Sequence, residues 1–561
     1  MSDAAPNPSL VESTVAQEPL QFTTKLAYGA GDLGAAITSN ILVFFLLFFF
    51  TNVAGLPAGL AGTVLAVGKI SDAINDPILG MMSDRTRSRW GRRLPWMLWG
   101  AVPFSLLFLA QWWVPQFSEN TTLNIWLLFA YYITISVLFN LAYTAVNLPY
   151  TALTPELTED YNERTSLNSY RMAFSIGGSI LSLLLAQLIF QVYRDAPFTQ
   201  YLMLGGVCAL LAVFSTVWCA LRIQERGSEP FLSRAGRRRL GWGAWGLSTA
   251  LALVSAGALL GGTGVLTPGG FASILGFLFS FLLLAAGWTL VRSAPEPHLT
   301  DAAAAQSRSL AYSTPSLPIR AQLRIAFGTR AFLYVIGIYL CSWLGVQLIA
   351  SILIYFVVSW MGIAEESFVS VAIAVQGTAL VMLFVWRWAS DRLGKRAVYG
   401  LGTSLWLVAQ AGLFFLQPGQ VGWLYALAIL AGSGVSVAYL IPWSMVPDVI
   451  ELDELHTGQR REGIFYGMMV LLQKLGLAIA LFLVGQVLEF AGFVPQIPGE
   501  PIPTQPTSAL LAIRLTIGPL PMLVLIAGLV LAYFYPLTRE VHSQLRQELS
   551  QRRAAARSPK A

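Results

Sequence analysis

Long apolar runs recur along the whole chain, and they limit what it can fold into more than any other feature does. About 20 apolar residues in a helix span the hydrocarbon of a bilayer. Fourteen runs of near that length lie at about 26–51, 57–83, 95–114, 123–147, 168–192, 200–222, 241–265, 270–291, 331–360, 366–388, 397–417, 421–446, 464–490 and 509–535. Only 11% of the residues are charged and the mean hydropathy is +0.63, which excludes a soluble globular protein. The sequence therefore predicts an all-α protein embedded in a membrane.

The runs fall into groups of six, two and six, and this grouping predicts the domain organisation. We expect a disordered cytoplasmic tail, a six-helix bundle, cytoplasmic linkers that carry two inserted transmembrane helices, a second six-helix bundle and a basic cytoplasmic tail. The corresponding residues are 1–24, 25–222, 223–330 (with helices at 241–265 and 270–291), 331–538 and 539–561. The inserted pair interrupts neither bundle, so we expect it on the periphery.

The positions of lysine and arginine predict the orientation. If both termini are cytoplasmic, the inside segments hold 29 of the 35 basic residues, and the outside loops hold only Arg194. This distribution follows the positive-inside rule. The net charge of +6 therefore reports topology, and no nucleic-acid partner is expected. We predict an integral protein of the cell (inner) membrane with both termini in the cytoplasm.

The two groups of six have Asp-Arg pairs and prolines after corresponding runs, which indicates an internal repeat. Asp84-Arg85 follows the second run of the first group, and Asp391-Arg392 follows the second run of the last group. After the fourth runs, Pro149 and Pro442 occupy matching places. Parallel duplication of this kind is how the major facilitator fold is built, with a substrate site near the middle of the membrane.

A charged face lies inside the second run. Lys69, Asp72 and Asp76 fall within about 60° of one another on a helix, with Asn75 at the edge of the same face. Charges inside a membrane are costly, so they face a bundle interior or a water-filled cavity and by default mark an ion or substrate path. A polar anchor between helices is the alternative.

These residues also carry a family resemblance. The stretch from Lys25 to Gly34, the Asp72-Ala-Ile-Asn75-Asp76-Pro77 run and the stretches from Pro149 to Arg171 and from Pro447 to Glu451 resemble the glycoside-pentoside-hexuronide:cation symporters. This is the melibiose carrier group of the major facilitator superfamily. The resemblance covers the twelve core runs and implies a major facilitator fold that couples uptake of a sugar or glycoside-like solute to Na⁺ or H⁺ by alternating access.

The resemblance implies a cation site at Asp72, Asn75, Asp76 and Thr144. Carboxylate, amide and hydroxyl oxygens suit Na⁺, and Asp72 and Asp76 are the expected ligands. Two neighbouring carboxylates repel each other and could instead share a proton, so the ion stays open. Lys474 matches a family lysine that could neutralise the aspartates when the cation is absent, and Lys69 is a second charge available for coupling.

Substrate contact is implied for Asp32, Asn147, Arg171 and Lys474. The galactoside carriers of the family have acidic residues where this chain has Ala36 and Asn147, and a threonine where it has Val470. Carboxylates are good acceptors for sugar hydroxyls, so galactosides themselves are disfavoured. A lysophospholipid carrier branch of the superfamily is the alternative, and a membrane sensor that binds without transport is an alternative of another class.

A cytoplasmic gate is implied between the two halves. Its residues are Asp84, Arg85, Arg92, Arg93, Asp391, Arg392, Asp448, Glu451 and Glu454. The three histidines, His298, His456 and His542, lie outside the apolar runs, and the three cysteines have no metal-binding spacing. We therefore expect no enzyme activity and no cofactor besides the coupling ion. The expected partners are a small-molecule solute and the lipid bilayer, and we expect a monomer.

Overall fold

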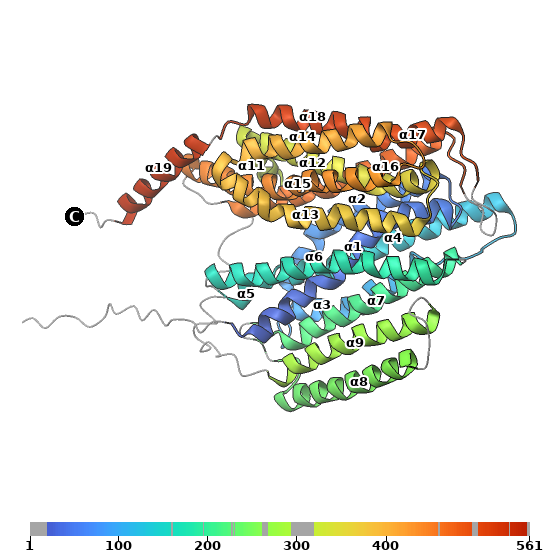
Figure 1. The fold of residues 1–561 in the computed structure, drawn as a ribbon. Helices are drawn as coiled ribbons and strands as arrows, with labels where there is room; N and C mark the ends of the chain where they lie inside the picture. Colours follow the sequence, from blue (N-terminus) through green and yellow to red (C-terminus); the bar gives the residue numbers. More distant parts are fainter. Residues whose placement is uncertain are drawn as a thin grey trace, which may run out of the picture.

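The computed structural model describes residues 20–158, 161–194, 196–225, 228, 230–260, 267–292, 319–457, 461–495, 503–537 and 539–557. Within these residues the regular elements are all helices. Most of them are long and run side by side along one direction, as Figure 1 shows. This is the arrangement that backbone polar groups require inside a bilayer, where each must be satisfied within its own helix.

The N-terminal half contains α1 (Phe22–Asn52), α2 (Ala58–Arg85), α3 (Leu94–Ala110), α4 (Thr121–Thr151), the short α5 (Thr154–Leu157), α6 (Tyr161–Val192) and α7 (Pro197–Arg222). α1 packs along both α6 and α7, while α4 packs between α2 and α3. Glycines permit these close approaches. A Cβ on Gly68 of α2 would lie 2.1 Å from Ser136 Oγ of α4.

The C-terminal half contains α11 (Ile319–Gly328), α12 (Arg330–Tyr355), the π-helical turn η1 (Phe356–Trp360), α13 (Glu365–Leu393), α14 (Lys395–Phe415), α15 (Val421–Thr457), α16 (Glu462–Phe490), α17 (Thr507–Ile517), α18 (Pro519–Phe534) and α19 (Arg539–Arg557). The main contacts between the halves are made by three helix pairs, α2 with α16, α6 with α13 and α1 with α12. The second long helix of each half therefore packs against the fifth long helix of the other half.

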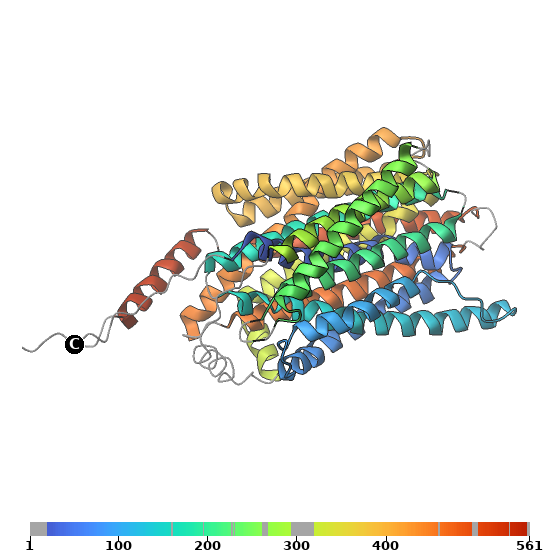
Figure 2. The same cartoon turned by 90° about the horizontal axis from the view of Figure 1, so that it is seen from below.

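The inserted helices α8 (Arg234–Leu260) and α9 (Pro268–Val291) lie at the edge of the N-terminal half (Figures 1 and 2). They pair with each other through Ser248 and Ser280, whose hydroxyls lie 3.1 Å apart. α9 attaches the pair to the bundle, because Trp218 Nε1 of α7 donates to Thr289 Oγ1 at 2.9 Å. This position agrees with the predicted peripheral packing.

Twelve helices of the described residues are long and apolar enough to cross a membrane. α3, an apolar helix of only 17 residues, and α2, which carries the charged face, are not among them. α2 nevertheless has 28 residues, or about 42 Å at 1.5 Å per residue. The count of fourteen spans stays a prediction.

Several predicted boundaries differ from the structure. α1 begins at Phe22, so residues 22–24 do not belong to a disordered tail; residues 1–19 lie outside the described residues. α8 begins seven residues before 241 and includes a run of arginines, which are good helix formers. The last predicted span is broken at Gly518, since Pro519 and Pro521 have no N–H to continue the helix.

Two further helices occupy segments that were predicted as linker or tail. α11 lies within the predicted linker 223–330 and packs on α12 and α16, where Ala326 is fully buried. α19 occupies most of the predicted tail, and its Leu545 and Leu549 are buried in the core of the C-terminal half. Tertiary packing supports both helices, since neither has an apolar run of its own.

The two ends of the bundle differ. We call the end with the arginine-rich loop after α2 and with α19 the basic side, and the other end the opposite side. On the opposite side one apolar core contains residues of both halves, such as Phe48 beside Tyr355 and Phe45 beside Phe368. On the basic side the halves have separate cores.

Candidate functional site

A cluster of charged side chains lies where α2, α4 and α16 meet. Lys474 Nζ of α16 is 3.0 Å from Asp72 Oδ1 and 2.6 Å from Asp76 Oδ2. Thr144 Oγ1 of α4 lies 2.8 Å from Asp72 Oδ1 and 3.2 Å from Asp76 Oδ1. Asp72 is only 2% exposed. The cluster spans both halves of the protein, since Lys474 belongs to the C-terminal half.

Helix geometry explains why these groups converge. Asp72 and Asp76 are one turn apart, so both carboxylates leave α2 on the side of α4 and α16. α2 and α16 come close because Gly62 faces Gly485, where a Cβ on Gly62 would lie 2.9 Å from the Gly485 Cα. Lys474 lies three turns before Gly485 on α16, which brings its ammonium to the level of the aspartates.

Two further predicted residues, Asn75 and Lys69, make hydrogen bonds to other residues than the cluster. Asn75 Nδ2 donates to Ser71 Oγ at 3.1 Å, one turn back on the same helix. Lys69 Nζ donates to Asn140 Oδ1 of α4 at 3.3 Å. The structure therefore brings together Asp72, Asp76, Thr144 and Lys474, and it gives Asn75 and Lys69 other hydrogen-bond partners.

The predicted solute residues lie on α1, α4 and α6. Asp32 of α1 is within electrostatic range of Arg171 of α6, as expected from the packing of these two helices. Arg171 Nε is buried and has no hydrogen-bond partner among the described residues. A buried guanidinium N–H without an acceptor is costly, so this position calls for an acceptor that the described residues do not supply.

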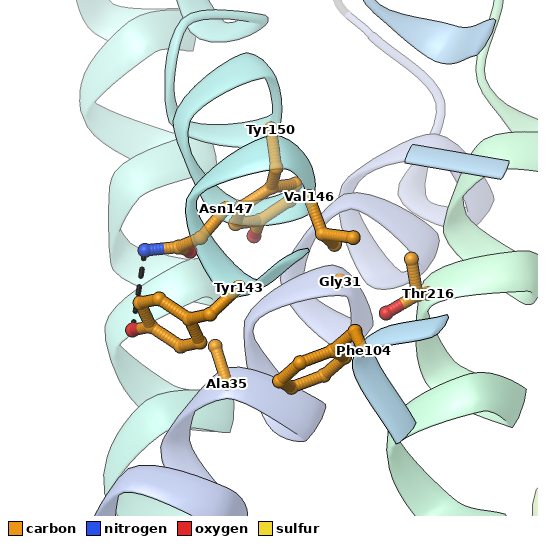
Figure 3. A pocket seen from close by; sticks show the side chains of 8 residues that line it. All are labelled: Gly31, Ala35, Phe104, Tyr143, Val146, Asn147, Tyr150 and Thr216. Carbon is orange, nitrogen blue, oxygen red and sulfur yellow. Dashed lines mark hydrogen bonds between the residues drawn. The ribbon is translucent and has the colours of Figure 1, made fainter. Parts of the chain in front are cut away.

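Asn147 lines a small cavity inside the N-terminal half (Figure 3). Its Nδ2 donates to Tyr143 Oη at 3.3 Å, as the dashed line in the figure marks, while its Oδ1 is buried and finds no partner in the described part of the chain. Gly31, Phe104 and Thr216 complete much of the wall. The cavity volume is about 10 Å³, near the minimum for one water. The cavity is too small for a sugar and has space for about one water molecule beside Asn147.

Four of the predicted gate residues on the basic side contact residues of their own half. Asp84 Oδ1 of α2 accepts from Arg93 Nη2 at 2.9 Å. Asp448 of α15 accepts from Lys395 Nζ at 2.7 Å, and the guanidinium of Arg392 stacks on Trp388 at 4.1 Å from the ring centroid. The gate prediction is not tested by these contacts. The Asp391 side chain lies outside the described residues.

One partner of the gate acids was missed at the sequence level. His542 Nε2 of α19 is 2.9 Å from Glu451 Oε2 and 3.4 Å from Asp448 Oδ1. Nothing in the local sequence pointed to this contact, because His542 lies in a polar segment about 90 residues further along the chain. Glu454, Arg85 and Arg92 complete the predicted set. Glu454 and Arg85 lie at the basic ends of α15 and α2, and Arg92 lies in the loop between α2 and α3.

The opposite side holds a second set of contacts between the halves, and the sequence did not predict it. Arg194 pairs with Glu366, and Tyr201 Oη donates to Glu365 Oε2 at 3.1 Å. The Gly59 N–H donates to Glu489 Oε2 at 3.1 Å. We call this set the opposite-side clasp. It joins the ends of α2, α6 and α7 to those of α13 and α16.

Comparison with known families gives one match over most of the chain. The family described as MFS/sugar transport protein matches residues 27–246 and 233–539. The first matched segment covers the N-terminal half and the start of α8, and the second covers α8, α9 and the C-terminal half.

Relatives and a solved structure agree with this match. An uncharacterized symporter of Synechocystis sp. is 58% identical over 97% of this chain and 99% of its own length. The sodium-dependent lysophosphatidylcholine symporter 1 of Gallus gallus is 25% identical over 97% of this chain and 92% of its own. The inward open conformation of the xylose transporter XylE from E. coli covers 94% of this chain and 98% of its own with a TM-score of 0.51 and 14% identity, which supports the fold alone.

Proposed function

The chain belongs to the MFS/sugar transport protein family, and on that premise we propose that it carries a sugar or glycoside-like solute across a membrane together with Na⁺ or H⁺. The family and the relatives are membrane transporters and symporters, and cation-coupled symport is the function of this chain. It is not an enzyme. The identity of the solute, the choice of ion and the residues that bind them are the parts that we propose.

The observation that carries the proposal is the position of Lys474 between Asp72 and Asp76. Its ammonium lies 2.6 Å and 3.0 Å from the two carboxylates, where a coupling cation would have to bind. A buried carboxylate beside a second, partly buried one needs a positive charge near it. We infer that Lys474 supplies this charge when no cation is present, and that an arriving cation takes its place.

This exchange couples cation binding to movement of the two halves. Lys474 belongs to α16 and the aspartates to α2, so the ion pair ties the halves together midway along their contact. A cation held by Asp72, Asp76 and Thr144 satisfies the carboxylates from within the N-terminal half. Lys474 is then free to turn toward the solute, and α16 is free to move against α2. A ligand shifts such an equilibrium only by its differential affinity for the two states, and the exchange of partners supplies that difference.

The contacts at the two ends support an inward-facing state if the basic side is cytoplasmic. The opposite-side clasp holds the halves together at one end, and the halves keep separate cores at the other. Alternating access would open the clasp and bring the basic side together. In the closed form we expect Asp448 and Glu451 to exchange Lys395 and His542 for arginines of the N-terminal half.

The solute site is proposed between Asp32, Arg171 and Lys474. The Arg171 Nε without a partner is a donor that a sugar hydroxyl or a carboxylate could satisfy. Asp32 supplies an acceptor nearby, and Lys474 supplies a second donor once the cation has displaced it. We expect bonds to buried charged groups to set the orientation of the solute.

Uptake into proteoliposomes tests the proposal. A panel of glycosides, pentosides, hexuronides and lysophosphatidylcholine would be measured under an imposed Na⁺ or H⁺ gradient, for the wild type and for Asp76→Asn. Accumulation of a glycoside that is driven by one gradient and lost in the variant is the expected result. If a solute binds but neither gradient drives its accumulation, symport of these solutes is the wrong function.

Lysophospholipid transport is the second candidate, and two observations favour it. Ala36 and Val470 stand where the galactoside carriers of the resembling family have polar side chains, and Val470 is 37% exposed. A relative that spans nearly the whole chain is named a sodium-dependent lysophosphatidylcholine symporter. Accumulation of lysophosphatidylcholine alone in the same assay would select this function.

A further inference from the structure

Glu225 makes an unusual set of hydrogen bonds just after the end of α7. Glu225 is only 3% exposed, although it lies outside the helices. Its carboxylate accepts the backbone N–H groups of Arg92 at 2.8 Å, Arg93 at 2.8 Å and Leu94 at 2.7 Å. A buried carboxylate with three short bonds to consecutive amides of a distant segment holds that segment in one conformation.

The amides belong to the last two residues of the loop before α3 and to the first residue of α3. The first N–H groups of a helix have no partner within the helix, and the residue that precedes α3, Arg93, makes no capping hydrogen bond with its side chain. A negative charge is favourable at this end of a helix. Glu225 therefore acts as the cap of α3 from more than 130 residues away in the sequence.

Gly91 makes this contact possible. Its φ of +103° lies in the region that favours glycine. A Cβ at this position would lie 2.3 Å from Glu225 Cδ and 2.5 Å from both carboxylate oxygens. Both the turn before Arg92 and the approach of the carboxylate require glycine here.

The segment that Glu225 holds is the loop that leads from α2 into α3. We call residues 86–93 the gate loop, because it carries two of the proposed gate arginines. Arg93 also bonds to Asp84 at the end of α2 at 2.9 Å. Trp90 packs on Phe231, with ring centroids 4.6 Å apart, and so attaches the same loop to the segment after Glu225.

We propose that Glu225 is a positioning residue for the gate, which holds Arg92 and Arg93 in the orientation that they need to meet acids of the C-terminal half. It touches neither solute nor cation. Its side chain fixes the backbone of the gate loop on the N-terminal half, so that the arginines arrive together when the basic side closes. The inference rests on the proposed alternating access and adds a residue to it.

The direct test is hydrogen exchange of the full-length protein in lipid nanodiscs. In Glu225→Gln the three amides of residues 92–94 lose their hydrogen bonds to a charged acceptor. Because these bonds stabilise the closed state of the loop, exchange of the three amides should become faster by about tenfold or more. Glu225→Asp keeps the charge but is one methylene shorter, and we expect a smaller increase. Glu119→Gln, which removes an exposed acid from another loop, is the matched control and should change nothing.

Transport and a state-sensitive amide separate positioning from mere stability. In Glu225→Gln the maximal transport rate should fall several-fold while the half-saturating solute concentration stays unchanged. The Gly59 amide, which Glu489 protects only while the opposite side is closed, should exchange more slowly. Gly91→Ala should give the same effects, and the double variant should add nothing.

The outcomes decide the proposal in either direction. Unchanged exchange at residues 92–94 would show that Glu225 does not hold the loop. Faster exchange there with wild-type transport and a wild-type Gly59 amide would show that holding the loop does not serve the gate. If the wild type accumulates no solute, the proposed function fails, and exchange at residues 92–94 and Gly59 still decides the role of Glu225.

Discussion

Replacing Lys474 by glutamine tests the proposed exchange between an ammonium and a coupling cation. The side chain keeps its length and polarity but loses the charge that neutralises Asp72 and Asp76. Thr144, which is 2.8 Å and 3.2 Å from the carboxylates, would then be the remaining described partner of the pair from another helix. We expect this change to lower the stability of the cation-free protein and to raise its affinity for the cation.

The size of the effect follows from burial. Removing one partner of a buried ion pair costs about 3–5 kcal/mol, because the other charge is left uncompensated. The side chains of Lys474 and Asp76 keep 18% and 24% exposure, so water screens the pair and the lower end, about 3 kcal/mol, applies. In the variant a bound cation supplies the missing positive charge and so recovers this energy. In the wild type Lys474 already supplies that charge, so the cation gains nothing from it. Because about 1.4 kcal/mol equals a factor of ten, cation affinity should rise roughly 100-fold.

The assay is titration of purified protein with Na⁺, and in parallel with acid, followed by the shift of the melting temperature. Lys25→Gln is the control, since Lys25 pairs with Glu163 at 2.9 Å far from the site. Solute accumulation should be lost in Lys474→Gln, because cation binding no longer breaks a contact between the halves. A folded Lys474→Gln variant with wild-type or weaker affinity for both cations would refute the exchange.

Three other predictions follow from the same structure. Thr144→Val keeps the shape but removes the hydroxyl, and the cation affinity should fall by about tenfold, the equivalent of one hydrogen bond to a charged group; an unchanged Na⁺ or H⁺ midpoint would remove Thr144 from the site. Arg194→Glu should repel Glu366 and open the opposite-side clasp, which would increase labelling of a cysteine placed in that clasp by a membrane-impermeant thiol reagent, and adding Glu366→Arg should restore the wild-type level. If the double variant labels like the single one, the pair does not hold the clasp. Replacing residues 234–291 by a flexible linker should leave transport intact and lower the melting temperature slightly, whereas a folded protein without transport would show that α8 and α9 take part in the cycle.

Much of the fold follows from local properties of the sequence. The long apolar runs predicted the positions of the helices. The matching Asp-Arg pairs at the ends of α2 and α13 and the matching prolines within α4 and α15 predicted two repeated halves. Lys69, Asp72, Asn75 and Asp76 marked a polar face because charge is costly in hydrocarbon wherever the rest of the chain lies. These conclusions depend on residues within a few turns of one another.

The boundaries and several helices depended on packing instead. α11 and α19 have no apolar run of membrane length, and they are helical where Ala326, Leu545 and Leu549 find a core to pack on. The break at Gly518 depends on two prolines within an apolar run that otherwise suits a single helix. Hydropathy averages over such positions and so misses them.

The sequence by itself determined which side chains carry charge in the membrane, whereas the tertiary structure decided how they pair. Lys474 lies almost 400 residues from Asp76, and only the crossing of α2 and α16 at their glycines brings the ammonium within 2.6 Å of the carboxylate. The same holds for Glu225 at the start of α3, for His542 beside Glu451 and for the opposite-side clasp. Spacing along one helix can be counted from the sequence, but a contact between helices depends on their distance and rotation, which the packing of the whole bundle sets.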